Sequence, residues 1–214
     1  MKKTFQYLNS SNLHKNLQKT KYITFSGNFV QQKEEIASLS FAEIESTSNV
    51  KYLGIEFDYH LTWEQQINKL SSKLHSQLYL LRQINMYRNR NLTKLAYVTL
   101  IEPYLKYGII LWGRTYKKLT QRIFKQQKMA IRIIAGLKKG ESCRTSFQNL
   151  NILPLQSLYI YEVILYVKSH NLLKRNNKHN YETRSKQNSS NPEAQLIRTK
   201  LKENLPQYIG QKLF

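Results

Sequence analysis

The spacing of apolar residues changes at Thr62, and no other feature of the chain constrains its fold as strongly. Before this point, apolar and polar residues alternate, which is the pattern of half-buried β-strands. After it, apolar residues recur at intervals of three and four, which places them on one face of a helix. Five residues carry this helical spacing: Ile67, Leu70, Leu74, Leu78 and Leu81. The sequence therefore predicts a mainly helical α+β protein, with a small N-terminal antiparallel sheet, a helical bundle and a poorly ordered basic tail.

Three segments before the change are rich in strand-forming residues: 21–26, 38–46 and 50–57. We expect them to form the small sheet. Gly54 lies inside the last of these segments, and a glycine within a strand indicates a bulge or the close approach of another backbone. Thr62 and Gln65 then have the spacing of a capping box, which marks the first turn of a helix.

Later helices are delimited by prolines and glycines. The second begins near Asn91, and Pro103 should kink or split it, because proline cannot continue a helix. Gly113 should end this second run, and Gly136 should end a third helix over 116–135. A fourth helix follows Pro154, with Leu155, Leu158, Val163 and Val167 on its packed side. The predicted parts are 1–61 (sheet), 62–173 (helical domain), 174–191 (solvated basic linker) and 192–214 (C-terminal extension).

The third predicted helix has two chemically different sides. At 100° per residue, one side collects a core set: Leu119, Ile123, Gln127, Ala130 and Ile134. An arc of about 120° on the opposite side collects five cations with no acidic residue among them. This basic stripe consists of Lys118, Arg122, Lys125, Lys128 and Arg132. It predicts contact with nucleic acid phosphates without sequence specificity, the alternative being a solvated surface helix. Tyr104, Tyr107 and Trp112 could stack on bases or belong to the core.

The composition favours an anionic partner. Lys and Arg number 34 against 13 acidic residues, which gives a formal charge of +21. Such an excess opposes compact folding unless a polyanion neutralises it, although an AT-rich genome would also raise the lysine content. The single cysteine, Cys143, excludes a disulfide framework and fits a reducing compartment. With no secretory signal and no membrane-spanning segment in the sequence, we expect an intracellular protein of the nucleus or cytoplasm.

The sequence offers little for catalysis. Asp58 is the only aspartate, whereas nucleotidyl transfer by two metal ions needs at least two carboxylates held close together. The histidines are scattered singly, and a catalytic Cys143 would need a base that no motif supplies. We therefore expect no catalytic residue, no metal site and no cofactor in this chain.

Six segments of the chain occur in an order that resembles a known family. They read NLQKTKYITFS, VKYLGIEFDYHLTWEQQI, LTKLAYVTLIEPYLKYGIILWG, QQKMAIRIIAGL, LNILPLQSLYIYEVILYVKSH and HNYETRSK. Together they resemble the C-terminal part of reverse transcriptases from jockey-like non-LTR (LINE-type) retrotransposons. The resemblance runs from about Leu13 to the end of the chain.

The resemblance implies a right-hand polymerase whose magnesium-binding palm motif precedes the segments present here. Asn16, Lys19 and Thr20 match a segment at the edge of the family's palm. Tyr52, Leu53 and Gly54 match the turn that resembles the primer grip, where the primer backbone is held. The helices after Trp63 are similar to the thumb and its extension. The implied partners are an RNA/DNA template–primer duplex and the missing upstream palm and fingers region.

The chain also departs from the family. The fingers motifs and the paired aspartates of the palm are missing, Lys15 replaces a usual apolar residue, and Gln66 replaces a frequent histidine. We therefore expect a truncated fragment or degenerate copy that cannot polymerise alone. Two alternatives stay open: a helical adaptor that binds nucleic acid, a protein or an acidic membrane, and a transposon product without function. Asp58 should make local hydrogen bonds in the turn before Thr62.

Overall fold

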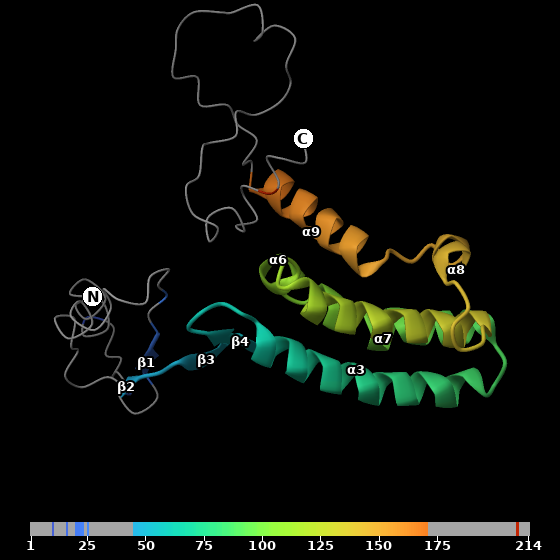
Figure 1. Ribbon diagram of the computed structural model, residues 1–214, viewed down its shortest axis with the longest axis horizontal. Coiled ribbons are helices and arrows are strands. Elements are labelled where there is room, and N and C mark those ends of the chain that lie inside the picture. Colours follow the sequence, from blue (N-terminus) through green and yellow to red (C-terminus); the bar gives the residue numbers. More distant parts are fainter. Residues whose placement is uncertain are drawn as a thin grey trace, which may run out of the picture. The chain divides into compact units, whose positions relative to one another are not determined.

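The computed structural model describes residues 45–170, together with Ser10, Asn16, 20–23, Phe25 and Ile209 (Figure 1). The chain divides into two compact units, 1–65 and 66–214. The predicted linker over 174–191 lies outside the described residues, as does the extension over 192–214 apart from Ile209. The predicted strand over 38–46 is described only from Glu45 onward. The described residues are mainly helical with a small antiparallel sheet, as predicted.

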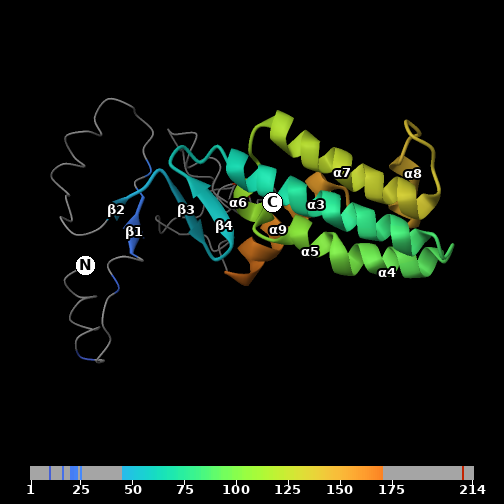
Figure 2. The ribbon, with the colours of Figure 1, turned by 90° about the horizontal axis from the view of Figure 1, so that it is seen from below.

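The described residues of unit 1 include two pairs of short strands. Strand β1 (Lys21–Tyr22) pairs in parallel with β2 (Glu45–Ser46), in a two-stranded sheet separate from β3 and β4. The expectation that these segments join one antiparallel sheet was therefore wrong for this pair. Strands β3 (Asn49–Tyr52) and β4 (Ile55–Asp58) pair antiparallel (Figure 2). A small antiparallel sheet is therefore present, as predicted, but both of its strands come from a segment that the sequence predicted as one strand.

The interpretation of 50–57 as one strand with a bulge at Gly54 was wrong. Tyr52 pairs with Ile55, so only Leu53 and Gly54 form the turn. Their φ angles are 47° and 82°, the doubly left-handed pattern of the two-residue turn that matches the twist of a hairpin. Paired residues share a face of the hairpin, so the apolar positions shift from even numbers (Val50 and Tyr52) to odd numbers (Ile55 and Phe57) across the two-residue turn.

Within residues 45–170, the first helix follows this hairpin. Helix α3 (Glu64–Asn85) buries all five apolar residues that predicted it, and Ser71 is buried beside them. Thr62 Oγ1 accepts a hydrogen bond from the Glu64 backbone N–H at 3.5 Å. The predicted start of the helix is therefore confirmed to within two residues.

The proline and glycine signals are also confirmed. Helix α4 (Arg90–Leu100) and α5 (Glu102–Lys106) are separated at Ile101, with Pro103 in the first turn of α5, where its missing N–H costs nothing. Helix α6 (Ile109–Trp112) ends at Gly113. A Cβ there would lie 2.5 Å from both Ile109 O and Tyr159 Cδ2, so this position needs glycine for close packing.

Three further helices of unit 2 are described: α7 (Lys117–Ala135), α8 (Arg144–Asn149) and α9 (Leu155–Ser169). Gly136 ends α7 with φ 69°, and its N–H and that of Leu137 bond the last turn. Helix α9 buries the four residues predicted for it. Helices α3 and α7 lie side by side and run in the same direction, because Asn68 meets Arg122 and Ser71 meets Gln126 (Figure 2).

Candidate nucleic-acid interface

A buried glutamine fixes helix α7 against two other helices. Gln127 is 1% exposed, and its Nε2 donates hydrogen bonds to Tyr97 Oη on α4 (3.0 Å) and to the Leu153 carbonyl (2.9 Å). Its Oε1 accepts from the Leu155 backbone N–H at 2.8 Å, at the first turn of α9. Burial raises the pKa of the Tyr97 hydroxyl, which stays protonated. The amide therefore links α4, α7 and α9 at one point.

A second buried glutamine joins α7 to α3. Gln126 Nε2 donates to the Oγ and the carbonyl of Ser71, at 2.9 and 3.2 Å, and lies 2.7 Å from His75 Nδ1. The predicted core residues Ile123, Gln127, Ala130 and Ile134 are all buried, and Leu119 is half-buried. With this side of α7 held by the core, the basic stripe must face away from it.

The first three residues of the basic stripe are more exposed than the last two. Lys118, Arg122 and Lys125 are exposed, and Arg122 Nη1 also donates to Asn68 Oδ1 at 2.6 Å. Lys128 and Arg132 are half-buried. From first to last, the stripe rises about 21 Å along the helix, which matches about six steps of a nucleic acid duplex.

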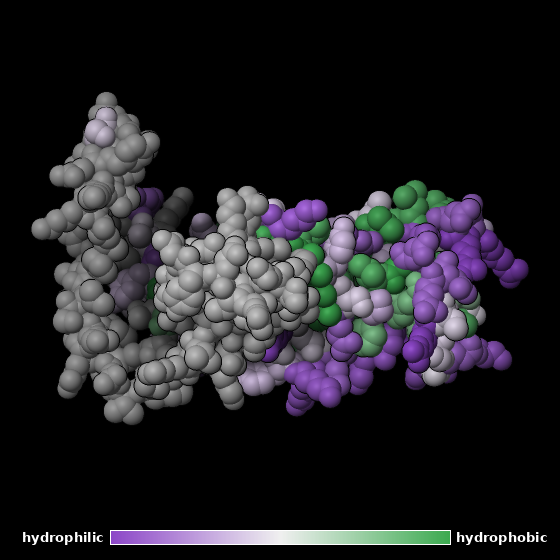
Figure 3. Space-filling model, turned by 90° about the horizontal axis from the view of Figure 1, so that it is seen from above, coloured by the Kyte–Doolittle hydropathy of each residue, from purple (hydrophilic) through white to green (hydrophobic). Residues whose placement is uncertain are grey.

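Of the half-buried cations, Arg132 contacts the loop that follows α7 and Lys128 contacts an aromatic ring of α7 itself. Arg132 donates from Nε and Nη2 to the Glu141 carbonyl, at 3.3 and 3.0 Å. Lys128 Nζ lies 4.9 Å from the centre of the Phe124 ring, a cation–π geometry. Both side chains also line two hollows on either side of the loop, of about 850 and 630 Å³. Figure 3 shows hydrophilic side chains gathered beside apolar surface at the end of unit 2 that carries α8.

The structure adds cations that the stripe did not include. Arg144 lines the larger hollow, and Arg82 and Lys139 line the smaller one together with Lys125. Lys139 and Arg144 come from the basic stretch after Gly136, so their local charge was visible in the sequence. Their position next to α7 could not be predicted from the sequence, because it depends on how the loop returns to the helix.

The aromatic residues that interleave with cations divide by burial. Trp112 is fully buried, and its Nε1 donates to the Tyr107 carbonyl at 3.0 Å, so it belongs to the core. Tyr104 is half-buried, with Lys73 Nζ 5.2 Å from its ring centre. Tyr107 is exposed. Of the three, Tyr107 alone presents an exposed ring for stacking.

The three residues matched to the primer grip form the tip of the β3–β4 hairpin in unit 1. Tyr52 is 64% exposed and Leu53 is 72% exposed. Leu53 also adopts a left-handed φ of 47°, which is unfavourable for a side chain of its size. The basic stripe belongs to the other compact unit.

Asp58 has a structural role. Its Oδ1 accepts hydrogen bonds from the N–H and Oγ1 of Thr62, at 2.8 and 3.1 Å, and its Oδ2 accepts from the Trp63 N–H at 2.7 Å. Leu61 and Trp63 have φ angles of 53° and 64°, which are unfavourable for side chains of their size. The carboxylate therefore stabilises a strained connection between β4 and α3. The predicted local hydrogen bonds before Thr62 are confirmed.

The magnesium ions that the family resemblance implies do not fit the residues that the structure describes. Both oxygens of Asp58 are occupied by backbone and hydroxyl donors. Within the described part of the chain, no three His, Cys, Asp or Glu side chains gather to form a metal site.

Comparison with other proteins gives no family assignment. No protein family, curated protein or solved structure matches the chain. Separately, none of the helices among the described residues combines the length and apolar character needed to cross a lipid bilayer.

Proposed function

We propose that this chain is the distal palm, thumb and C-terminal extension of a non-LTR retrotransposon reverse transcriptase, and that it holds an RNA/DNA template–primer duplex. The observation that carries the proposal is the basic stripe of α7, whose opposite side is held in the core by Gln126 and Gln127. The order of the six sequence segments supports the family. A nucleic-acid partner also favours a location in the nucleus or cytoplasm.

The stripe would bind the duplex through its backbone. Phosphate contacts release counterions, so the logarithm of affinity falls linearly with the logarithm of salt concentration, by about 0.9 per contact on a B-form duplex. Five contacts predict a slope of about −4.5. Base edges would not be read, because contacts to phosphates carry no direct sequence information.

Charge reversal tests this assignment. We would replace Lys118, Arg122 and Lys125 by glutamate and measure affinity for an RNA/DNA hybrid by fluorescence anisotropy across a salt series. The matched control reverses three exposed cations elsewhere on unit 2, namely Arg88, Arg90 and Lys168. The stripe variant should bind at least tenfold more weakly than the control, with a slope smaller by about 2.7. Equal affinities for the two variants would contradict the proposal.

We also propose that the chain does not polymerise by itself. Its only aspartate is used in the connection between β4 and α3. A primer-extension assay with the purified chain, deoxynucleotides and magnesium should therefore yield no product. Extension that survives Asp58→Asn would show that other residues supply the metal ligands.

A second candidate function is that of a helical adaptor. Leu92, Leu95 and Val98 recur every three residues on α4, and all three are more than 40% exposed. Such an apolar face fits a protein partner. A dissociation constant for the hybrid above about 100 μM at physiological salt would favour the adaptor, because ordinary non-specific binding is tighter than that.

A further inference from the structure

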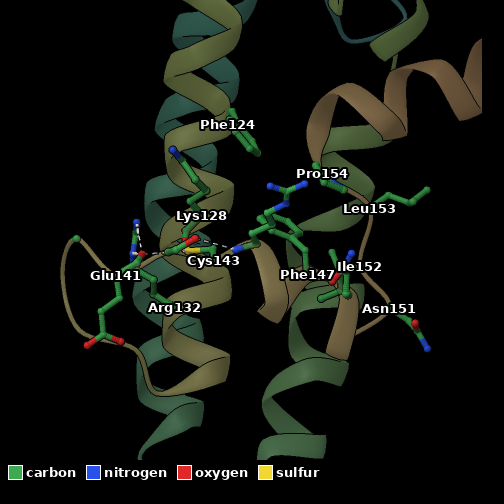
Figure 4. Close-up of a pocket in the computed structure, with 14 residues that line it drawn as sticks. Phe124, Lys128, Arg132, Glu141, Cys143, Phe147, Asn151, Ile152, Leu153 and Pro154 are labelled. Carbon is green, nitrogen blue, oxygen red and sulfur yellow. Dashed lines mark hydrogen bonds between the residues drawn. The ribbon is translucent and has the colours of Figure 1, made fainter.

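The larger of the two hollows lies between α7 and the segment that joins α8 to α9. Phe124, Lys128 and Arg132 line it from α7, whereas Phe147, Ile152 and Pro154 line it from the other side (Figure 4). Its volume is about 850 Å³, within the range of about 300–1,000 Å³ that is typical of ligand pockets. We refer to it as the α7–α8 cavity.

The lining combines aromatic surface with positive charge. Phe124 and Phe147 are stacked, with ring centres 6.2 Å apart and an angle of 26° between their planes. Three cations line the same space: Lys128, Arg132 and Arg144. Glu141 is the one acidic residue of the lining, and Figure 4 shows its carboxylate pointing away from the phenylalanines. The cavity therefore suits a flat ligand that carries negative charge.

The cavity is continuous with the basic stripe, because Lys128 and Arg132 belong to both. A duplex presents phosphates outside and keeps its bases stacked inside, so it can lie on the stripe but cannot fill an aromatic cavity. An unpaired nucleotide can, since its base stacks on aromatic rings while its phosphates meet cations. Lys128 Nζ and the Phe124 ring are already neighbours, at 4.9 Å, so both kinds of contact are available together.

We propose that the α7–α8 cavity binds an unpaired nucleotide that continues from the end of a duplex lying on the basic stripe. This assignment rests on the proposed duplex-binding function. Aromatic stacking tolerates every base, because each base has a π-face. The protein should therefore prefer a duplex with a single-stranded overhang to a blunt duplex, by about tenfold and with little dependence on the overhang sequence.

The test compares RNA/DNA hybrids of equal duplex length that are blunt or carry a two-nucleotide overhang. A 2-aminopurine in the overhang reports stacking through its loss of fluorescence, and anisotropy gives the affinities. The variants are Phe124→Leu, which keeps apolar bulk, and Arg144→Gln; Arg90→Gln removes an exposed cation that does not line the cavity. Phe124→Leu should abolish the tenfold gain and the fluorescence change while the blunt hybrid binds as before. Arg144→Gln should reduce the gain, and Arg90→Gln should leave it intact.

The outcomes separate this inference from the function on which it rests. Salt-dependent binding of the blunt hybrid, with no gain and no fluorescence change from the overhang, would overturn the cavity assignment and leave duplex binding standing. Failure to bind either hybrid would overturn both. A third outcome is that a free mononucleotide binds, that Phe124→Leu weakens its binding, and that the overhang adds no affinity. The cavity would then bind free nucleotides, and the proposed continuation from a duplex would be wrong.

Discussion

The β3–β4 hairpin and helix α7 carry the two sets of residues proposed to contact nucleic acid, and they are built in opposite ways. The hairpin and its connection to α3 depend on local bonds, since Asp58 reaches no further than Trp63. Helix α7 depends on distant partners, since Gln126 bonds Ser71, 55 residues away, and Gln127 bonds Leu155, 28 residues away. A local change should therefore disturb the hairpin alone, whereas the direction in which the basic stripe faces depends on the whole helical unit.

The strongest test of this contrast is Gln127→Ala. The substitution leaves the Leu155 N–H, the Leu153 carbonyl and the Tyr97 hydroxyl without their buried partner. We expect a loss of about 3 kcal/mol in the free energy of unfolding, because unsatisfied buried polar groups cost about 1–3 kcal/mol each. Urea unfolding followed by circular dichroism measures it. Gln121→Ala, at an exposed position of the same helix, should change stability by less than about 0.5 kcal/mol.

The two tryptophans show which unit responds. Trp63 lies in unit 1 and Trp112 in unit 2, so fluorotryptophan labelling gives one ¹⁹F signal for each. Gln127→Ala should shift the unfolding of the Trp112 signal and leave that of Trp63 in place. Equal shifts of both signals would show that the two units unfold together.

Asp58→Asn tests the hairpin side of the contrast. The amide keeps one acceptor oxygen but turns an NH₂ group towards a backbone N–H that now bonds the carboxylate. We expect a loss of about 2 kcal/mol, since hydrogen bonds to charged groups contribute about 1.5–3 kcal/mol. The Trp63 ¹⁹F signal should report it. Glu64→Gln neutralises an exposed carboxylate nearby and should lower the free energy of unfolding much less. An equal loss in the two variants would mean that the negative charge, and not the hydrogen bonds of Asp58, stabilises the connection.

The turn itself offers a substitution with the opposite sign. Leu53→Asn should stabilise the hairpin by about 1 kcal/mol, because asparagine tolerates the left-handed region better than leucine. Gly54→Ala should destabilise it by about the same amount, because alanine is strained at φ 82°. Hydrogen exchange across β3 and β4 measures both. If Leu53 contacts the primer, Leu53→Asn should also weaken binding of the hybrid, and unchanged affinity would remove Leu53 from the interface.

The smallest expected effect concerns alkaline pH. Burial raises the pKa of Tyr97 above the usual value of about 10, so the folded state keeps a proton that the unfolded state loses. Stability should then fall as pH rises through about 10 and beyond. Tyr97→Phe should cost about 1 kcal/mol at neutral pH, because Gln127 still bonds Leu153. Its deficit should shrink above pH 10, as measured by urea midpoints; the exposed Tyr79→Phe control should show no such trend.

The same contrast explains what could be predicted from the sequence. The buried faces of α3 and α7 follow from a 3.6-residue period, and the hydrogen bonds of Asp58 lie within five residues of it. Both features could therefore be predicted from the sequence. The residue pattern did not predict the hairpin turn, because leucine before glycine is not a usual turn signal, whereas asparagine would have been. Only the family resemblance implied a turn at Tyr52, Leu53 and Gly54. The burial of Gln126 was missed because its partner Ser71 is on another helix.

The α7–α8 cavity lay beyond sequence analysis for a similar reason. Phe124 and Phe147 stack only because the connection after Gly136 turns back along α7, and no local pattern specifies that path. The clustering of Lys128, Arg132 and Arg144 depends on the same turn. The tertiary arrangement, and not the composition of any segment, brings these charges and rings together.

The single cysteine of the chain lies in the wall of this cavity. Cys143 is 5% exposed, and its sulfur is 3.7 Å from the Lys128 carbonyl. Alkylation of the thiol requires the wall to open, so its rate measures how often the α7–α8 connection separates from the helix. The alkylation rate of Cys143 therefore reports this local motion in the native chain, and no second thiol contributes to the signal. A bound nucleic acid that closes the cavity would lower this rate.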